Sequence, residues 1–181
     1  GRRLRKVHDD ILVDMKAFVE ERMKTVQLSK ERQKERMAKI TEEERGQVRS
    51  VCGALNWAGR EGRPDAAAAA SMFSSQLMEM TVEDVIELNK IVSRIKENSN
   101  LALRIQAIPE SRMRWGVVTD ASWANAKGGK TQGGHMLLTF DVDLLAGKQA
   151  MCNLLHWKSG KLHRTGNSSL AAESQSLARG V

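Results

Sequence analysis

The sequence of 181 residues predicts an α+β chain in which helices up to about residue 100 precede a sheet and a further helix. Two observations carry this prediction. Through most of the first hundred positions apolar residues recur at the spacing of one helix face, which is typical of amphipathic helices. From residue 101 apolar and polar residues alternate in short runs, which is typical of strands with one buried face.

The first predicted helix spans Val7 to Met23, with its apolar residues on one face and charged residues elsewhere. That face comprises Val7, Ile11, Leu12, Met15, Phe18, Val19 and Met23. Asp9 and Asp10 fall inside this pattern, so we expect them on a solvated helix surface and not on a hairpin. Residues 29–45 are dense in mixed charge and nearly free of apolar residues, which predicts an exposed connector.

Three further helices are predicted between Thr41 and about residue 97, and we expect them to pack together. Thr41 and Thr81 each stand three residues before an acid, the pattern of a capping box at a helix start. A break at 59–62 and an Arg-Pro-Asp at 63–65 lead into the second helix, whose five alanines permit close approach of a neighbour. The residues predicted to face inward are Val48, Val51, Cys52, Leu55 and Ala58, then Val85, Leu88, Val92 and Ile95.

Four strands are predicted in the second part of the chain, at residues 101–107, 115–120, 133–140 and 150–157. The short spacers between the last three favour an antiparallel meander. A polar, glycine-containing loop over residues 158–167 is expected next, and a helix begins at Ser168.

Lys and Arg outnumber Asp and Glu by 29 to 22, a formal net charge of +7. This balance favours a polyanionic partner such as nucleic acid, and a solvated basic surface is the alternative. The distant Cys52 and Cys152 are expected to be reduced and buried, which fits an intracellular compartment. No stretch approaches the roughly 18 apolar residues of a membrane span, so no membrane partner is expected. The chain starts without Met and stops within a helical pattern, which predicts a fragment.

Two carboxylates are candidates for metal-dependent chemistry. Asp120 closes an apolar strand, and Glu173 lies one turn into the last predicted helix. Hydrolysis of a phosphodiester by two metal ions needs carboxylates that converge from such elements. The same positions also suit a turn residue and a partner of the helix dipole, so spacing alone leaves both interpretations open.

Four short motifs in order resemble the reverse transcriptase and ribonuclease H region of copia-type retrotransposon Pol polyproteins. They are Arg-Pro-Asp at 63–65, Thr-Asp-Ala-Ser-Trp-Ala at 119–124, Leu-His-Trp-Lys-Ser at 155–159 and Ser-Ser-Leu-Ala-Ala-Glu-Ser at 168–174. The resemblance covers roughly residues 40–181. It departs from the family at Ser122 and Ala171, where acids are common, and the chain lacks a Tyr-x-Asp-Asp polymerase motif.

The resemblance implies a helical connection segment over residues 1–100 and the N-terminal portion of a ribonuclease-H-like domain over 101–181. Asp120 and Glu173 would be its first two catalytic carboxylates and would ligate Mg²⁺ or Mn²⁺. The family's other metal-binding acids would lie downstream, in the remainder of the Pol polyprotein. The parent would hydrolyse RNA in RNA–DNA hybrids, in cytoplasmic virus-like particles or the nucleus; a catalytically dead nucleic-acid-binding or scaffold fragment is the rival interpretation.

The best local candidate for contact with a nucleic-acid backbone is the basic stretch Lys158, Lys161, His163 and Arg164, which we expect in a loop. An exposed hydrophilic loop without a ligand explains the same residues equally well. For His135 and His156, structural or surface roles are expected, because no metal-ligand spacing surrounds them.

Overall fold

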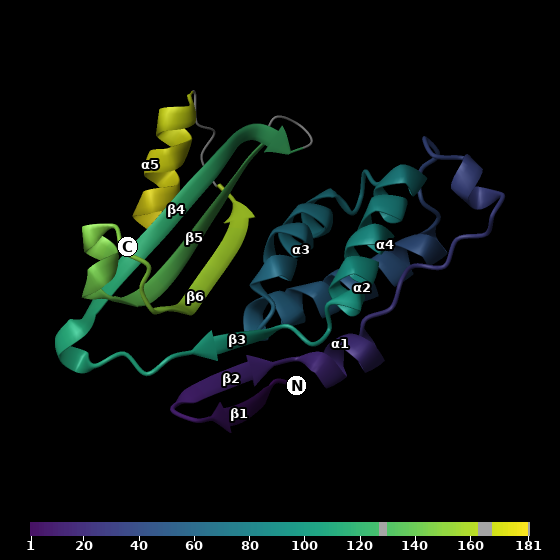
Figure 1. The fold of residues 1–181 in the computed structure, drawn as a ribbon. Helices are drawn as coiled ribbons and strands as arrows, with labels where there is room; N and C mark the ends of the chain where they lie inside the picture. Colours follow the sequence, from purple (N-terminus) through teal and green to yellow (C-terminus); the bar gives the residue numbers. More distant parts are fainter. Residues whose placement is uncertain (127–129, 163–167, 181) are drawn as a thin grey trace. The chain divides into compact units, whose positions relative to one another are not determined.

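The structure is a computed structural model that describes residues 1–126, 130–162 and 168–180. These residues divide into two compact units, one formed by residues 1–2 and 15–101 and the other by residues 3–14 with those from 102 onward. Within the described residues there are five α-helices and two three-stranded antiparallel sheets (Figure 1), which confirms the α+β class. None of the described helices is long and apolar enough to cross a bilayer.

The first unit is a helical domain built on the three predicted helices, with a short α1 (Lys16–Arg22) before them. They are α2 (Glu42–Glu61), α3 (Pro64–Gln76) and α4 (Val82–Glu97). Both capping boxes are present, since the hydroxyls of Thr41 and Thr81 accept from the backbone N–H three residues on. All nine residues predicted to face inward on α2 and α4 are buried, because their spacing places them on one side of each helix.

The turn between α2 and α3 depends on a buried arginine and on a close helix contact. A Cβ at Gly59 would lie 3.0 Å from the Cα of Ala67, so only glycine lets α2 and the alanines of α3 approach this closely. Arg63 is 1% exposed and donates from Nε and Nη2 to the Asp65 carboxylate at 2.9 and 2.7 Å. Its Nη1 also lies 3.4 Å from the carbonyl oxygen of Ile95 near the end of α4. The Arg-Pro-Asp motif therefore has a structural role in this unit.

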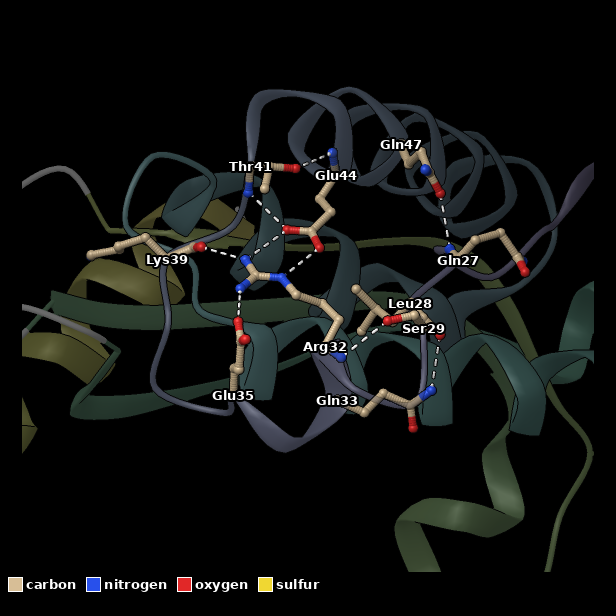
Figure 2. Close-up of polar contacts among 10 residues, drawn as sticks. All are labelled: Gln27, Leu28, Ser29, Arg32, Gln33, Glu35, Lys39, Thr41, Glu44 and Gln47. Atoms are coloured by element: carbon tan, nitrogen blue, oxygen red, sulfur yellow. Dashed lines mark hydrogen bonds and ion pairs between the residues drawn. The ribbon is translucent and has the colours of Figure 1, made fainter.

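The charged connector before α2 is fixed by one arginine (Figure 2). Arg32 lies in a 3-10 turn, Arg32–Lys34, and donates to both carboxylate oxygens of Glu44 at 2.8 and 3.1 Å. It also donates to Glu35 and to the carbonyl oxygen of Lys39. The Arg32 guanidinium lowers the pKa of the Glu44 carboxyl, and the same carboxylate closes the capping box at Thr41. The connector is thus an ordered arm whose charges join it to the start of α2.

The predicted helix over Val7 to Met23 is wrong before Lys16. Residues 3–14 form a hairpin of β1 (Arg3–Val7) and β2 (Asp10–Asp14), and β2 pairs with β3 (Ala102–Ile105). The local spacing suits a helix, but Ile11 and Val13 pair with Ile105 and Leu103, about ninety positions away, and this pairing overrides it. Asp9 therefore lies in a hairpin turn, and Asp10 pairs with Arg104 at 2.5 Å.

The second unit contains the predicted meander, with strand order β4-β5-β6. Its strands are β4 (Met113–Ala126), β5 (Lys130–Asp141) and β6 (Cys152–Lys161), each longer than the sequence indicates. Helix α5 (Ser169–Gly180) packs on β4 and β5 (Figure 1). The hairpin sheet joins this unit through Asn153 on β6, whose side-chain amide makes two hydrogen bonds with the backbone of Gln106.

An ion pair closes the end of the meander where β5 leads into the connection to β6. Arg112 donates from Nε and Nη2 to the Asp141 carboxylate, both at 2.7 Å, and also contacts Asp143 at 2.9 Å. These hydrogen bonds lower the pKa of the Asp141 carboxyl to about 2. The charged form of Asp141 is therefore the form that the folded state stabilises.

We predict that replacing the buried cation, Arg63→Ala, lowers the free energy of unfolding of the helical unit by about 2–4 kcal/mol, since it leaves a cavity and unpaired acceptors. Chemical denaturation measures this loss, and hydrogen exchange of the backbone amides in α3 and α4 locates it in the helical unit. Arg49→Ala removes an exposed arginine from α2 and serves as the matched control, with an expected change below about 0.5 kcal/mol. Equal effects of the two substitutions would contradict the structural role of Arg63.

We also predict a specific acid sensitivity at Asp141. Its folded-state pKa is below the ordinary value of 3.8, so its contribution to stability is present above about pH 4 and is lost as the pH falls towards 2. Asp141→Asn should destabilise the second unit at pH 6 and make little difference at pH 2, as judged from denaturation midpoints. Glu110→Gln, at an exposed carboxylate of the same unit, should show no such pH-dependent difference.

Candidate functional site

The candidate acid Asp120 lies in the middle of β4, where its backbone pairs with Gly134 of β5 and the residue is exposed. A Cβ at Gly180 would contact Val117 and Thr119, so α5 covers the face of β4 that these residues share. Alternate residues of a strand point to opposite faces. The Asp120 side chain therefore leaves the sheet on the face that α5 does not cover.

The second candidate acid, Glu173, reaches the edge of β4 from α5. Its Oε1 accepts a hydrogen bond of 3.3 Å from the backbone N–H of Ala121, the residue after Asp120. One turn later the buried Ser176 hydroxyl lies 2.9 Å from the carbonyl oxygen of Asp120 and 2.9 Å from that of Gly134. Two side chains of α5 thus hold the helix on the backbone at Asp120.

These contacts limit how far apart the two carboxylates lie. From the Glu173 bond and standard covalent geometry, an Asp120 carboxylate oxygen is within about 9 Å of Glu173 Oε1. We expect the two carboxylates to lie within about 8 Å of each other, which is close enough to share one divalent ion. Because Asp120 leaves by one face and α5 lies on the other, any ion they share would sit at the outer edge of β4.

The donor set suits one hard divalent cation better than two. Mg²⁺ is commonly bound by one or two carboxylates, with water and phosphate oxygens completing its coordination. In the part of the chain that the structure describes, no group of three or more His, Cys, Asp or Glu side chains is placed to hold a metal ion. Asp120 and Glu173 are therefore a pair of carboxylates and not part of a larger cluster of such side chains in the described residues.

The basic residues do not form the loop that the sequence predicts. Lys158 and Lys161 belong to β6, which continues four residues further than expected because Gly160 and Lys161 pair with Gly133 and Gln132. The predicted loop is therefore wrong over residues 158–161. Arg164, like His163, lies outside the described residues.

Sequence reasoning missed two residues of this region. Ser176 was not considered, although its spacing of four residues from Ala172 on a small-residue face indicates contact with a sheet. His135, for which the sequence predicts a structural or surface role, is directly opposite Lys158 and stacks on His156 with ring centroids 5.4 Å apart. The strand alternation places these rings on one face, but the register that makes them neighbours is set by long-range pairing.

The chain matches no protein-family model, no curated protein and no solved structure.

We predict that two substitutions of Glu173 distinguish the effect of its charge from the effect of its hydrogen bond. Glu173→Gln keeps an acceptor for the Ala121 N–H and should change the free energy of unfolding by less than about 0.5 kcal/mol, whereas Glu173→Ala should cost about 1 kcal/mol. Denaturation and the exchange rate of the Ala121 amide report the two effects. Ser174→Ala, at an exposed position of the same helix, is the control. A Gln variant as unstable as the Ala variant would show that the acceptor alone does not hold α5.

Proposed function

We propose that this chain supplies two carboxylate ligands of a ribonuclease-H-like nuclease and binds the phosphate backbone of RNA–DNA hybrids. The observation that carries the proposal is the hydrogen bond between Glu173 and the N–H of Ala121, which brings an acid on a helix to the peptide beside an acid on a strand.

The surrounding architecture supports the same proposal. An antiparallel meander carries Asp120 on its first strand, and a helix that packs on that strand carries Glu173. The order of the four sequence motifs resembles the copia-type ribonuclease H region, and the basic residues Lys158 and Lys161 follow in β6. The remainder of a Pol polyprotein would be its partner, in cytoplasmic particles or the nucleus.

The chemistry of the site follows from its charges. Asp120 and Glu173 would hold Mg²⁺ or Mn²⁺, which when bound supplies an activated water and a positive charge next to the leaving oxygen. Two carboxylates provide two negative charges, whereas two divalent metal ions carry four positive charges and repel each other at short distance. We therefore expect one weakly held ion, and hybrid cleavage far slower than that of an enzyme in which further metal-binding acids complete the site.

A second candidate function is a catalytically inactive module that binds nucleic acid or acts as a scaffold. It is favoured by the net charge of +7 and by the absence of a third metal ligand in the described ranges. It predicts salt-sensitive binding of hybrids without any dependence on Asp120 or Glu173.

Metal affinity separates these candidates. Mn²⁺ binding, measured by electron paramagnetic resonance, should show one weak site that Asp120→Asn and Glu173→Gln each weaken at least tenfold. Both substitutions keep the shape of the side chain and remove one charge at the site. Glu110→Gln, which removes an exposed carboxylate elsewhere in this unit, should leave the affinity unchanged.

The outcomes decide between the two functions. Mn²⁺ binding that ignores both substitutions, together with hybrid binding that falls steeply with salt, would support the inactive module and reject the metal site. Robust cleavage of a hybrid that Asp120→Asn abolishes would instead show that the site has more ligands than the two proposed.

A further inference from the structure

A hollow of about 430 Å³ lies over β5 and β6 beside α5, and neither Asp120 nor Glu173 belongs to its lining. Its lining includes His135, Lys158, Lys161 and Gly160. Among the described residues, every charged or titratable side chain in that lining is basic and none is a carboxylate. A cavity of this size can take a phosphate group with its attached sugar.

The basic groups of the hollow are brought together by the strand register. Lys158 is directly opposite His135 across β5 and β6, and His156 stacks on His135 with an interplanar angle of 19°. Lys158 is exposed and carries a positive charge, so an anion that enters the hollow meets a cationic side chain directly opposite His135.

Glycine residues, which have no side chain, leave the space for this hollow. Gly133 and Gly160 form a cross-strand pair on the face that α5 occupies, where the Leu162 side chain covers Gly133. A Cβ at Gly160 would meet nothing within 4 Å, so the hollow opens over this residue. Among described residues, φ values in the left-handed region occur only at His8 and Gly147, so a side chain at Gly160 strains neither the backbone nor a neighbour.

We propose that this hollow binds a phosphate group through Lys158 and His135 above Gly160. It rests on the proposed function for the source of that group, a nucleic-acid backbone, but it needs neither the metal nor the carboxylates. The shared chemistry is a phosphate monoester or diester, and free nucleotides are the second source that the experiment distinguishes.

The test uses the whole chain in the presence of a metal chelator, with adenosine 5′-monophosphate and adenosine as probes. In ¹H–¹⁵N spectra, the amide chemical shifts of residues 133–135 and 158–160 should change when the nucleotide is added and stay unchanged when adenosine is added. Gly160→Asp places a negative charge in the hollow without a clash and should weaken nucleotide binding at least tenfold, while Gly160→Ser changes it less than threefold. Lys158→Gln should weaken binding as well and tests the proposal independently of the aspartate variant's folding.

A short RNA–DNA hybrid distinguishes the two sources of phosphate. Competition between hybrid and nucleotide, with both weakened by Gly160→Asp, would support the hollow as a contact for the backbone. Loss of nucleotide binding alone would support a phosphate site that serves free nucleotides.

Two results would overturn the proposal. One is nucleotide binding that neither Gly160→Asp nor Lys158→Gln weakens, and the other is adenosine binding as strong as that of the nucleotide. If the hybrid still binds in those cases, the proposed function stands without this hollow, and Mn²⁺ binding at Asp120 and Glu173 is judged separately.

Discussion

The outward backbone amide of Ala121 is the constraint around which the second unit is organised. β4 lies at one end of the meander, where alternate N–H groups have no strand to pair with and need another acceptor. Glu173 supplies that acceptor, and Ser176 binds the neighbouring carbonyl groups on the face beneath α5. Satisfying the edge of the strand and positioning an acid beside Asp120 are consequently the same interaction.

In the proposed metal site, the Glu173 side chain would have two roles. An exposed acid that only formed an ion site could move without a change in stability, but Glu173 also holds α5 at the sheet edge. A cation at this position would compete with the Ala121 N–H for the same carboxylate. The hydrogen bond at 3.3 Å is long, so one oxygen can be drawn towards a cation at small cost while the other interactions of α5 remain.

The sequence predicts local structure well where the determinants are local. The capping boxes at Thr41 and Thr81 and the apolar faces after them define α2 and α4, and both helices are found. The hairpin of β1 and β2 was missed because its strand pattern over Ile11 and Val13 depends on β3, far along the chain. The same limit applies to β6, whose extension over Gly160 is set by pairing with β5.

The candidate site divides in the same way. Asp120 and Glu173 could be selected from residue type, expected strand and helix, and the order of motifs. The neighbours of His135 and the hollow over Gly160 could not, because both depend on the register of the meander. The spacing of Ser176 from Ala172 indicates contact with a sheet, but it does not show which backbone carbonyl groups the hydroxyl meets. The pairing register between strands that are far apart in the sequence therefore decides which basic residues become neighbours, and a short stretch of sequence does not reveal that register.

The geometry at the edge also limits how further ligands could reach Asp120. A strand that added to the outer edge of β4 would pair with the amides before Ala121, since Glu173 occupies the next one. Such a strand would end beside Asp120, and an acid at its end would lie near both carboxylates. A third ligand could therefore reach this edge without displacing α5. Three carboxylates close together repel one another, so a third acid here would require a bound metal ion to neutralise their charges. The hydrogen bond that closes the edge of the sheet at Ala121 also marks where a fuller metal site would have to be built.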